Sequence, residues 1–104
     1  MLDEDKARTL AECWINLICE VECQIVDDST IARPYGWIFF YQSKRFLETG
    51  EFGDQIAGNG PILVDRINFN LKTFGTARRI DEYLTEFEKT IPPTWLQMSK
   101  TKSK

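Results

Sequence analysis

Residues 37–42 (WIFFYQ) place the strongest constraint on how this chain folds. Aromatic and β-branched residues dominate the segment, which favours a β-strand. Because side chains alternate along a strand, the segment has two apolar faces, formed by Trp37, Phe39 and Tyr41 on one side and by Ile38 and Phe40 on the other. A strand that is apolar on both faces must be covered on both faces. We therefore expect residues 37–42 to form a central strand of a sheet with packing on each side.

Two helices are predicted at the ends of the chain. In residues 4–22, apolar side chains recur at spacings of three and four, which predicts a helix with one apolar stripe. That stripe consists of Ala7, Leu10, Ala11, Trp14, Leu17, Ile18 and Val21. We expect Asp3 to cap this helix and Trp14 to lie in the core. Residues 79–90 form the second predicted helix, which Pro92 and Pro93 end.

The segments between the helices are predicted to be mainly strands and turns. Residues 23–33 predict one or two short strands around a turn at 27–29, and residues 61–65 and 69–73 predict a hairpin. We expect residues 43–48 to continue as strand or turn, residues 49–54 to form a loop, and residues 55–57 to form one helical turn. The predicted fold class is α+β, with an N-terminal helix, an antiparallel sheet of three to five strands and a C-terminal helix packed against that one sheet.

The length of 104 residues suits a single domain. We expect this domain to cover residues 1–98, followed by a disordered basic tail at 99–104. Trp95, Leu96 and Met98 lie beyond the predicted end of the last helix. These three side chains either fold back onto the domain or form an exposed peptide.

The charge distribution indicates which partners the domain suits. The chain has 13 Lys and Arg against 16 Asp and Glu, and three of the lysines are in the last five residues. Without that tail, 10 basic and 16 acidic side chains remain, a net charge of −6. This argues against binding to nucleic acid or to an anionic membrane. An acidic body suits a basic protein partner, although ordinary solubility would also account for the charge.

The reactive residue types argue against an enzyme or a metal protein. There is no His, and the three cysteines, Cys13, Cys19 and Cys23, do not have zinc-ligand spacing. A general base near neutral pH would have to be a perturbed carboxylate or lysine, and pairing Glu48 with Asp54 matches no motif. We therefore expect no catalytic residue, no cofactor and no metal.

The cysteine count and the chain start bear on location. An odd number of cysteines suits a reducing compartment better than a disulfide scaffold. The sequence shows no signal peptide and no apolar run long enough to span a bilayer. A cytoplasmic location is expected.

Five short motifs, in order, resemble the immunity protein 35 family, also called YrhB-like. They are Gly36-Trp37, Leu47-Glu48-Thr49-Gly50, Ala57-Gly58-Asn59-Gly60-Pro61, Asp65 and Gly75-Thr76-Ala77. The resemblance covers residues 35–88. It implies a small bacterial cytoplasmic protein, encoded beside a polymorphic toxin, that protects the producing cell by binding the toxin. Papain-like peptidase toxins are one class that the resemblance implies as partner.

On this interpretation the loop after residue 48 is the predicted partner-binding site. Phe52 would be the aromatic anchor, with Glu48, Glu51 and Asp54 as acceptors for Arg or Lys of the toxin. The other candidates are Asn59, Trp37, Tyr41 and Phe69. Each has a structural alternative: Glu48 ties the loop, Asn59 forms a turn, Trp37 and Tyr41 lie in the core, and Phe69, where the family usually has Gly, folds inward.

A second hypothesis is a chaperone-like or general protein-binding module. The aromatic-rich sheet and the Trp95 segment would then offer apolar surface to client chains. Selective binding to one partner favours an immunity protein, whereas weak binding to many unfolded chains favours a chaperone. Homodimerisation through a strand edge or the Trp95 segment stays open.

Overall fold

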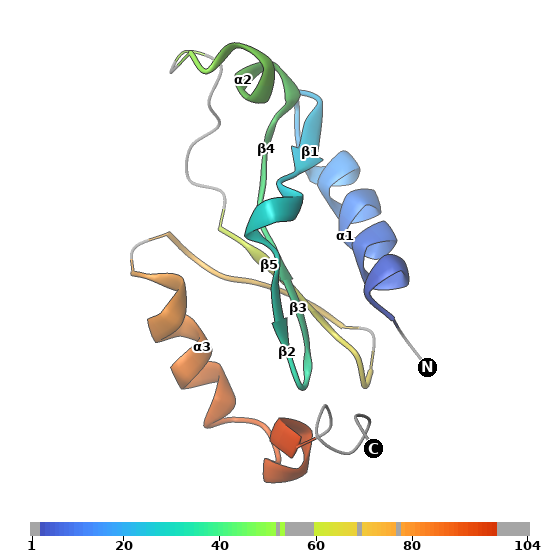
Figure 1. Cartoon of the computed structure of the whole chain (residues 1–104), viewed down its shortest axis with the longest axis vertical. Helices are drawn as coiled ribbons and strands as arrows, with labels where there is room; N and C mark the ends of the chain where they lie inside the picture. The colour runs from blue at the N-terminus through green and yellow to red at the C-terminus, as the bar shows by residue number, and fades with distance from the viewer. Residues whose placement is uncertain (1–2, 52, 54–59, 69, 77, 98–104) are drawn as a thin grey trace.

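The computed structural model describes residues 3–51, 53, 60–68, 70–76 and 78–97 (Figure 1). It confirms the predicted α+β class, with a helix near each end and antiparallel strands between them. The elements are α1 (Glu4–Ile18), β1 (Cys23–Ile25), the 3-10 turn η1 (Asp27–Ser29), β2 (Ile31–Arg33), β3 (Gly36–Phe39), β4 (Tyr41–Ser43), α2 (Lys44–Thr49), β5 (Ile62–Asp65), β6 (Leu71–Thr73), α3 (Ile80–Glu88) and the 3-10 helix η3 (Pro93–Gln97).

The strands form two sheets rather than the one sheet that the sequence predicted. A four-stranded sheet has the order β2-β3-β5-β6, and β1 pairs with β4 separately, all antiparallel. The single strand predicted over residues 37–42 is divided at Phe40, because the partner segment is interrupted. Pairing with the preceding segment ends at Ile25↔Tyr41 and resumes at Ile31↔Ile38. The five residues 26–30 between these pairs, which include η1, lie opposite only two residues, 39–40.

The four-stranded sheet is covered on both faces, as predicted from the alternation in β3. One face packs against α1 through a cluster that contains Trp37, Phe39 and Tyr41. The opposite face carries Ile38 and half-buried Phe40, which pack with residues of α3. Figure 1 shows α1 and α3 on opposite sides of the sheet. Burial of both faces of β3 makes this strand the centre of the domain.

Helix α1 packs through only part of the predicted stripe. Its buried residues are Ala7, Ala11 and Ile15, at a spacing of four. Four large side chains of the predicted stripe are exposed: Trp14 is 37% exposed, Leu17 82%, Ile18 44% and Val21 52%. The prediction that Trp14 lies in the core was therefore wrong. The sheet supplies bulky aromatic side chains on this face, and the helix packs against them through two alanines and Ile15.

The ends of α1 follow local rules. The Asp3 side chain accepts a hydrogen bond from the Lys6 amide at 2.9 Å, which confirms the predicted N-cap. The helix stops at Ile18, four residues earlier than predicted, because Cys19 is extended. Residues 20–22 then lead into β1. The early end removes Val21 from the helix and leaves it in a bend beside Ile18.

Strands β5 and β6 form the predicted hairpin. A carboxylate organises its turn: Asp65 Oδ1 accepts hydrogen bonds from the amides of Ile67 at 2.6 Å and Asn68 at 3.0 Å. The Asp65 amide donates to the Asn70 carbonyl at 3.0 Å, which closes the turn. Asp65 itself is 6% exposed. A side chain therefore supplies in this hairpin the acceptor that local turns often take from the backbone.

The C-terminal segment folds back onto the domain. After α3, Ile91 and Trp95 pack against the cluster that lies between the sheet and α3. The buried Tyr35 hydroxyl donates to Glu88 at 2.8 Å and its ring lies 5.3 Å from that of Phe87. For Trp95 the structure shows the packed alternative, while Met98 lies outside the described residues.

Candidate partner-binding surface

The predicted loop site is built on α2, a short helix where the sequence predicted strand or turn. The Ser43 side chain accepts a hydrogen bond from the Phe46 amide at 2.9 Å and so caps the helix. Gly50 ends it in the left-handed conformation, with φ of 72°, and donates its amide to the Phe46 carbonyl at 2.7 Å. A serine before the helix and a glycine after it were the signals that could have identified it.

Replacing Gly50 by alanine is expected to destabilise the domain by about 1–2 kcal/mol, because a left-handed backbone crowds Cβ against the following carbonyl. Urea unfolding followed by circular dichroism measures this change. Gly53 is the matched control, since its φ lies outside the left-handed range and a Cβ there would have open space around it. Equal midpoints for the two variants would show that the turn at Gly50 is not constrained.

The two predicted acidic residues that the structure describes flank this turn. Glu48 lies in the last turn of α2 and Glu51 just beyond Gly50, and both are exposed. Thr49 fixes the turn between them: its hydroxyl donates to the Arg45 carbonyl at 3.0 Å and accepts from the Glu51 amide at 3.2 Å. Phe52, Asp54 and Asn59 lie outside the described residues, as does Phe69 of the β5–β6 turn. The described part of the predicted site therefore consists of two exposed acidic residues, Glu48 and Glu51, on either side of the capped end of α2.

The remaining two candidates, Trp37 and Tyr41, lie inside the domain. Trp37 is 5% exposed and Tyr41 is 8% exposed, both in the cluster beneath α1. The Arg66 guanidinium stacks over the Trp37 ring, 4.7 Å from its centroid. This placement agrees with the structural alternative for these residues. In this conformation they support the sheet and leave Glu48 and Glu51 at the surface.

Sequence reasoning missed a group of exposed apolar residues. The described residues that are large, apolar and exposed are Trp14, Leu17, Ile18, Val21 and Leu47. Four of them belong to the apolar stripe that the helical period predicts, and Trp14 among them was expected in the core. The spacing of Ala7, Ala11 and Ile15 was the available signal that α1 has a second, smaller face suited to close packing. The exposed group lies on α1, in the bend after it and on α2.

A surface cavity of about 370 Å³ lies between β6 and α3. Its arginine is already paired: Arg78 donates to both carboxylate oxygens of Glu86 at 2.7 Å and lies 4.7 Å from the Tyr83 ring centroid. The bidentate contact holds the pKa of Glu86 below its usual value and raises that of Arg78. The pair is thus held fully ionised and is poorly suited to donating or accepting a proton near neutral pH.

The buried thiol of Cys23 is poorly suited to act as a nucleophile. Cys23 is buried, and desolvation together with its neighbour Cys19 raises the pKa of its thiol to about 12. It therefore stays protonated near neutral pH, whereas a nucleophile must be a thiolate. Cys13 is exposed on α1. Within the described ranges, no three His, Cys, Asp or Glu side chains gather in a way that could hold a metal ion.

Comparison with known proteins gives two similarities. The sequence profile of the family described as Immunity protein 35 matches residues 5–84, which run from α1 into α3. The protein described as "Uncharacterized protein YrhB" of Escherichia coli (strain K12) is 38% identical over 53 residues, 51% of this chain and 56% of that protein. The chain thus matches little more than half the length of this curated relative. No solved structure matches. Among the described helices, none has the length and apolar character needed to cross a membrane.

Proposed function

Because this chain belongs to the immunity protein 35 family, we propose that it protects the cell that makes it by binding a cognate bacterial toxin directly. The family match over residues 5–84 is the observation that carries the proposal. Family membership itself was predicted from five short motifs and is confirmed. The proposal places the protein in the cytoplasm, where the toxin would act on its producer.

Inhibition by binding requires a preformed surface and no chemistry of the inhibitor's own. A preformed surface lowers the entropic cost of association. The turn after α2 provides one, since Ser43 and Gly50 fix both ends of the helix and Thr49 ties the exposed Glu51 backbone. The protonated Cys23 thiol and the paired Arg78 and Glu86 agree with a protein that binds rather than catalyses.

The proposed contacts on this chain are acidic. Glu48 and Glu51 present carboxylates that accept hydrogen bonds from Arg or Lys of the toxin. Phe52, Asp54 and Asn59, and Phe69 of the β5–β6 turn, complete the proposed set; all four lie outside the described residues. The net charge of −6 for the chain without its basic tail favours a basic toxin surface and disfavours nucleic acid. A papain-like peptidase is the proposed toxin class.

Co-expression with the toxin encoded beside the gene tests the function. Cells that produce the toxin alone should stop growing, and cells that also produce this chain should grow. The two purified proteins should bind with a dissociation constant in the nanomolar range, measured by calorimetry. An unrelated immunity protein of similar size serves as the control. Toxicity that persists despite abundant folded chain, with no binding, would contradict the proposal.

A chaperone-like module is the second candidate, and the exposed apolar residues of α1 favour it. Leu17 at 82% exposed is the kind of side chain that binds unfolded clients. A chaperone should reduce the aggregation of several unrelated heated proteins and should bind each of them weakly. Selective tight binding to one folded toxin, without an effect on aggregation, would decide against it.

A further inference from the structure

We propose that the exposed apolar residues of α1 and the bend after it bind the toxin, and that they fit a basic toxin face with an apolar centre. The α1 apolar face consists of Trp14, Leu17, Ile18 and Val21. The inference rests on the proposed function and extends it, because it assigns toxin binding to a surface separate from the turn after α2.

The α1 apolar face is contiguous. Trp14, Leu17 and Ile18 are three and four residues apart, so they are neighbours on one side of the helix, and Val21 follows in the bend. Isolated exposed apolar side chains are ordinary on protein surfaces. Contiguous exposed apolar side chains with a polar rim more often mark an interaction site. Trp14 is the residue type that most often contributes large binding energies in such sites.

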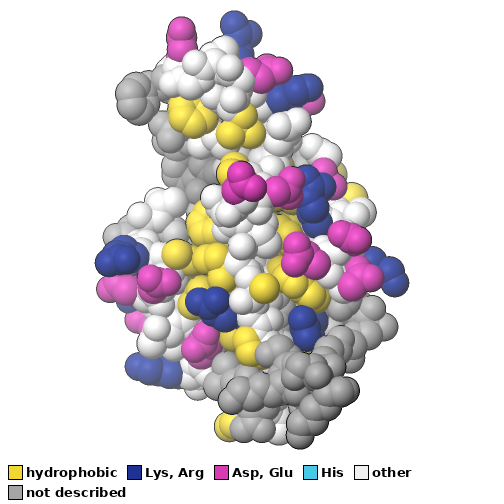
Figure 2. All heavy atoms as spheres, in the orientation of Figure 1, with side chains coloured by type: hydrophobic (Ala, Val, Ile, Leu, Met, Phe, Trp, Pro, Cys, Tyr) yellow, Lys and Arg dark blue, Asp and Glu magenta, His cyan; other side chains and the backbone are white. Residues whose placement is uncertain are grey.

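Acidic residues follow the α1 apolar face along the chain. Residues 17–28 include no Lys or Arg and carry four exposed acids: Glu20, Glu22, Asp27 and Asp28. Arg8 pairs with Asp27 at 2.7 Å and Lys44 with Glu22 at 3.5 Å, while Glu20 and Asp28 have no ion pair within the described residues. Figure 2 shows acidic side chains, with Lys and Arg among them, on the side of the molecule where α1 and η1 lie. Glu20, which lies in the bend between Ile18 and Val21 and is unpaired among the described residues, adds an acidic group to this apolar face and so complements a basic partner.

The same charges argue against a second copy of this chain as the occupant. A two-fold interface brings one surface patch against itself. Such a dimer would bring Glu20 and Glu22 of both copies to one interface, where like charges are costly. A basic toxin surface instead gains attraction from each of these acids. We therefore assign the α1 apolar face to a basic toxin rather than to a second copy of this chain.

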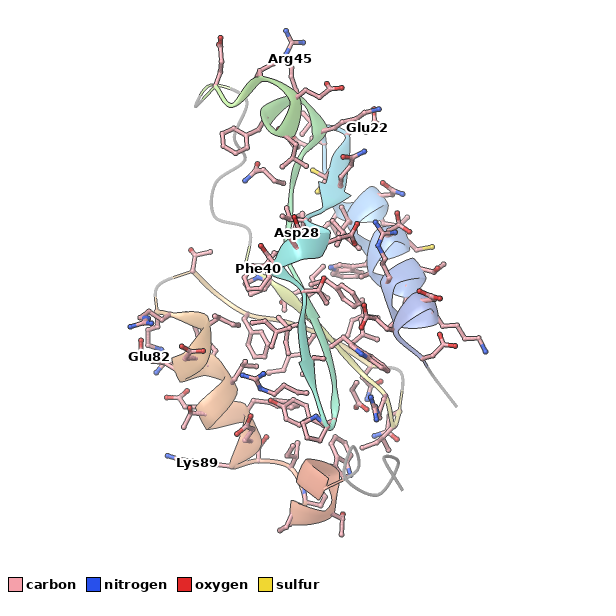
Figure 3. The ribbon with its side chains drawn as sticks, in the orientation of Figure 1. Glu22, Asp28, Phe40, Arg45, Glu82 and Lys89 are labelled. Atoms are coloured by element: carbon pink, nitrogen blue, oxygen red, sulfur yellow. The ribbon has the colours of Figure 1, made fainter. Side chains whose placement is uncertain are left out.

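The α1 apolar face adjoins α2, the base of the predicted loop site. The Lys44 amide donates to the Glu22 carbonyl at 2.8 Å, and the two side chains also form the ion pair. Figure 3 shows Glu22 at the end of the molecule where α2 lies. Leu47, 42% exposed, and Glu48 lie three and four residues after Lys44, on the same side of α2. One partner could therefore contact α1, the bend and α2 together.

Charge reversal at the centre of the face tests the inference. Leu17→Arg should weaken toxin binding about tenfold or more, because it removes an apolar contact and places a positive charge before a basic partner. Because Leu17 is 82% exposed, the Leu17→Arg variant should keep the fold of the domain, with an unchanged circular dichroism spectrum and urea midpoint. Thr85→Arg makes the same kind of change on exposed α3 and should bind as the wild type does.

A second variant separates charge from shape. Glu20→Lys keeps every apolar contact and should slow association and reduce its dependence on salt, as measured by stopped-flow fluorescence. If the wild type binds the toxin and both Leu17→Arg and Glu20→Lys bind equally well, the inference is overturned and the proposed function stands. If the wild type itself fails to bind, the proposed function fails. A wild-type dimer that Leu17→Arg dissociates, with toxin binding unaffected, would overturn the inference in favour of a second copy.

Discussion

Replacing Phe39 by alanine is expected to destabilise the domain by about 3–5 kcal/mol, which is the usual cost of truncating a buried phenylalanine. Phe39 is fully buried in the central strand and packs in the cluster beneath α1. Domains of this size have total stabilities of about 5–15 kcal/mol, so the variant should lose a large part of its stability. Urea unfolding at 25 °C, followed by tryptophan fluorescence, measures the loss.

The neighbouring residue provides the control for this substitution. Phe40 lies where the strand is divided, is half-buried and packs on the opposite face. Phe40→Ala makes the same chemical change with less burial lost, so its urea midpoint should fall by less than that of Phe39→Ala. A midpoint for Phe39→Ala equal to that of the wild type would show that the α1 side of the sheet is not the main core.

Replacing Gly36 by alanine is expected to cost about 3 kcal/mol or more, at the upper end for inserting one carbon into packed structure. A Cβ at position 36 would collide with the backbone carbonyl of Val64 and lie 3.1 Å from the Asp65 Cα. Gly36 pairs with Asp65 in the register of β3 and β5, so relief of the collision requires these strands to separate. Thermal unfolding by calorimetry should show the loss.

A second glycine shows whether the collision causes the effect. Gly75→Ala would place its Cβ 2.8 Å from the Tyr83 hydroxyl, which is the movable end of a side chain. This variant should unfold close to the wild-type temperature. If Gly36→Ala and Gly75→Ala unfold at the same temperature as the wild type, the close approach of β3 and β5 described here is incorrect.

Three of the family motifs have a physical explanation in the structure, and the first is the lack of space for a side chain at Gly36. Gly36-Trp37 combines a position that admits no side chain with one whose ring fills the core beneath α1. In Leu47-Glu48-Thr49-Gly50, Gly50 ends α2 and the Thr49 hydroxyl accepts a hydrogen bond from the Glu51 amide, which fixes the backbone of that residue. Asp65 supplies the acceptor for the β5–β6 turn. These three motifs build the scaffold, and Glu48 in the second of them is exposed.

Several features followed from the sequence because local physics determines them. The alternation of β3 assigned Trp37 and Ile38 to opposite faces, and both faces are buried as expected. The hairpin of β5 and β6 and the Asp3 cap depend on residues close in the chain. The five motifs identified the family. Glu48 and Glu51 were placed correctly at the surface because charged side chains are rarely buried without a partner.

Other features depended on partners distant in the chain. Periodicity showed that α1 has apolar residues but could not tell which line of them packs, since both the line of Ala7 and Ala11 and the line of Trp14 and Ile18 fit a helix. Packing against the large aromatic side chains of β3 decided this, and the line of Ala7, Ala11 and Ile15 is the one that faces them. The division of the strand at Phe40 was likewise decided by η1 in the opposing segment. The sequence alone thus determined the fold class, most of the elements and the family, and tertiary packing decided which apolar residues of α1 are buried and which are left at the surface.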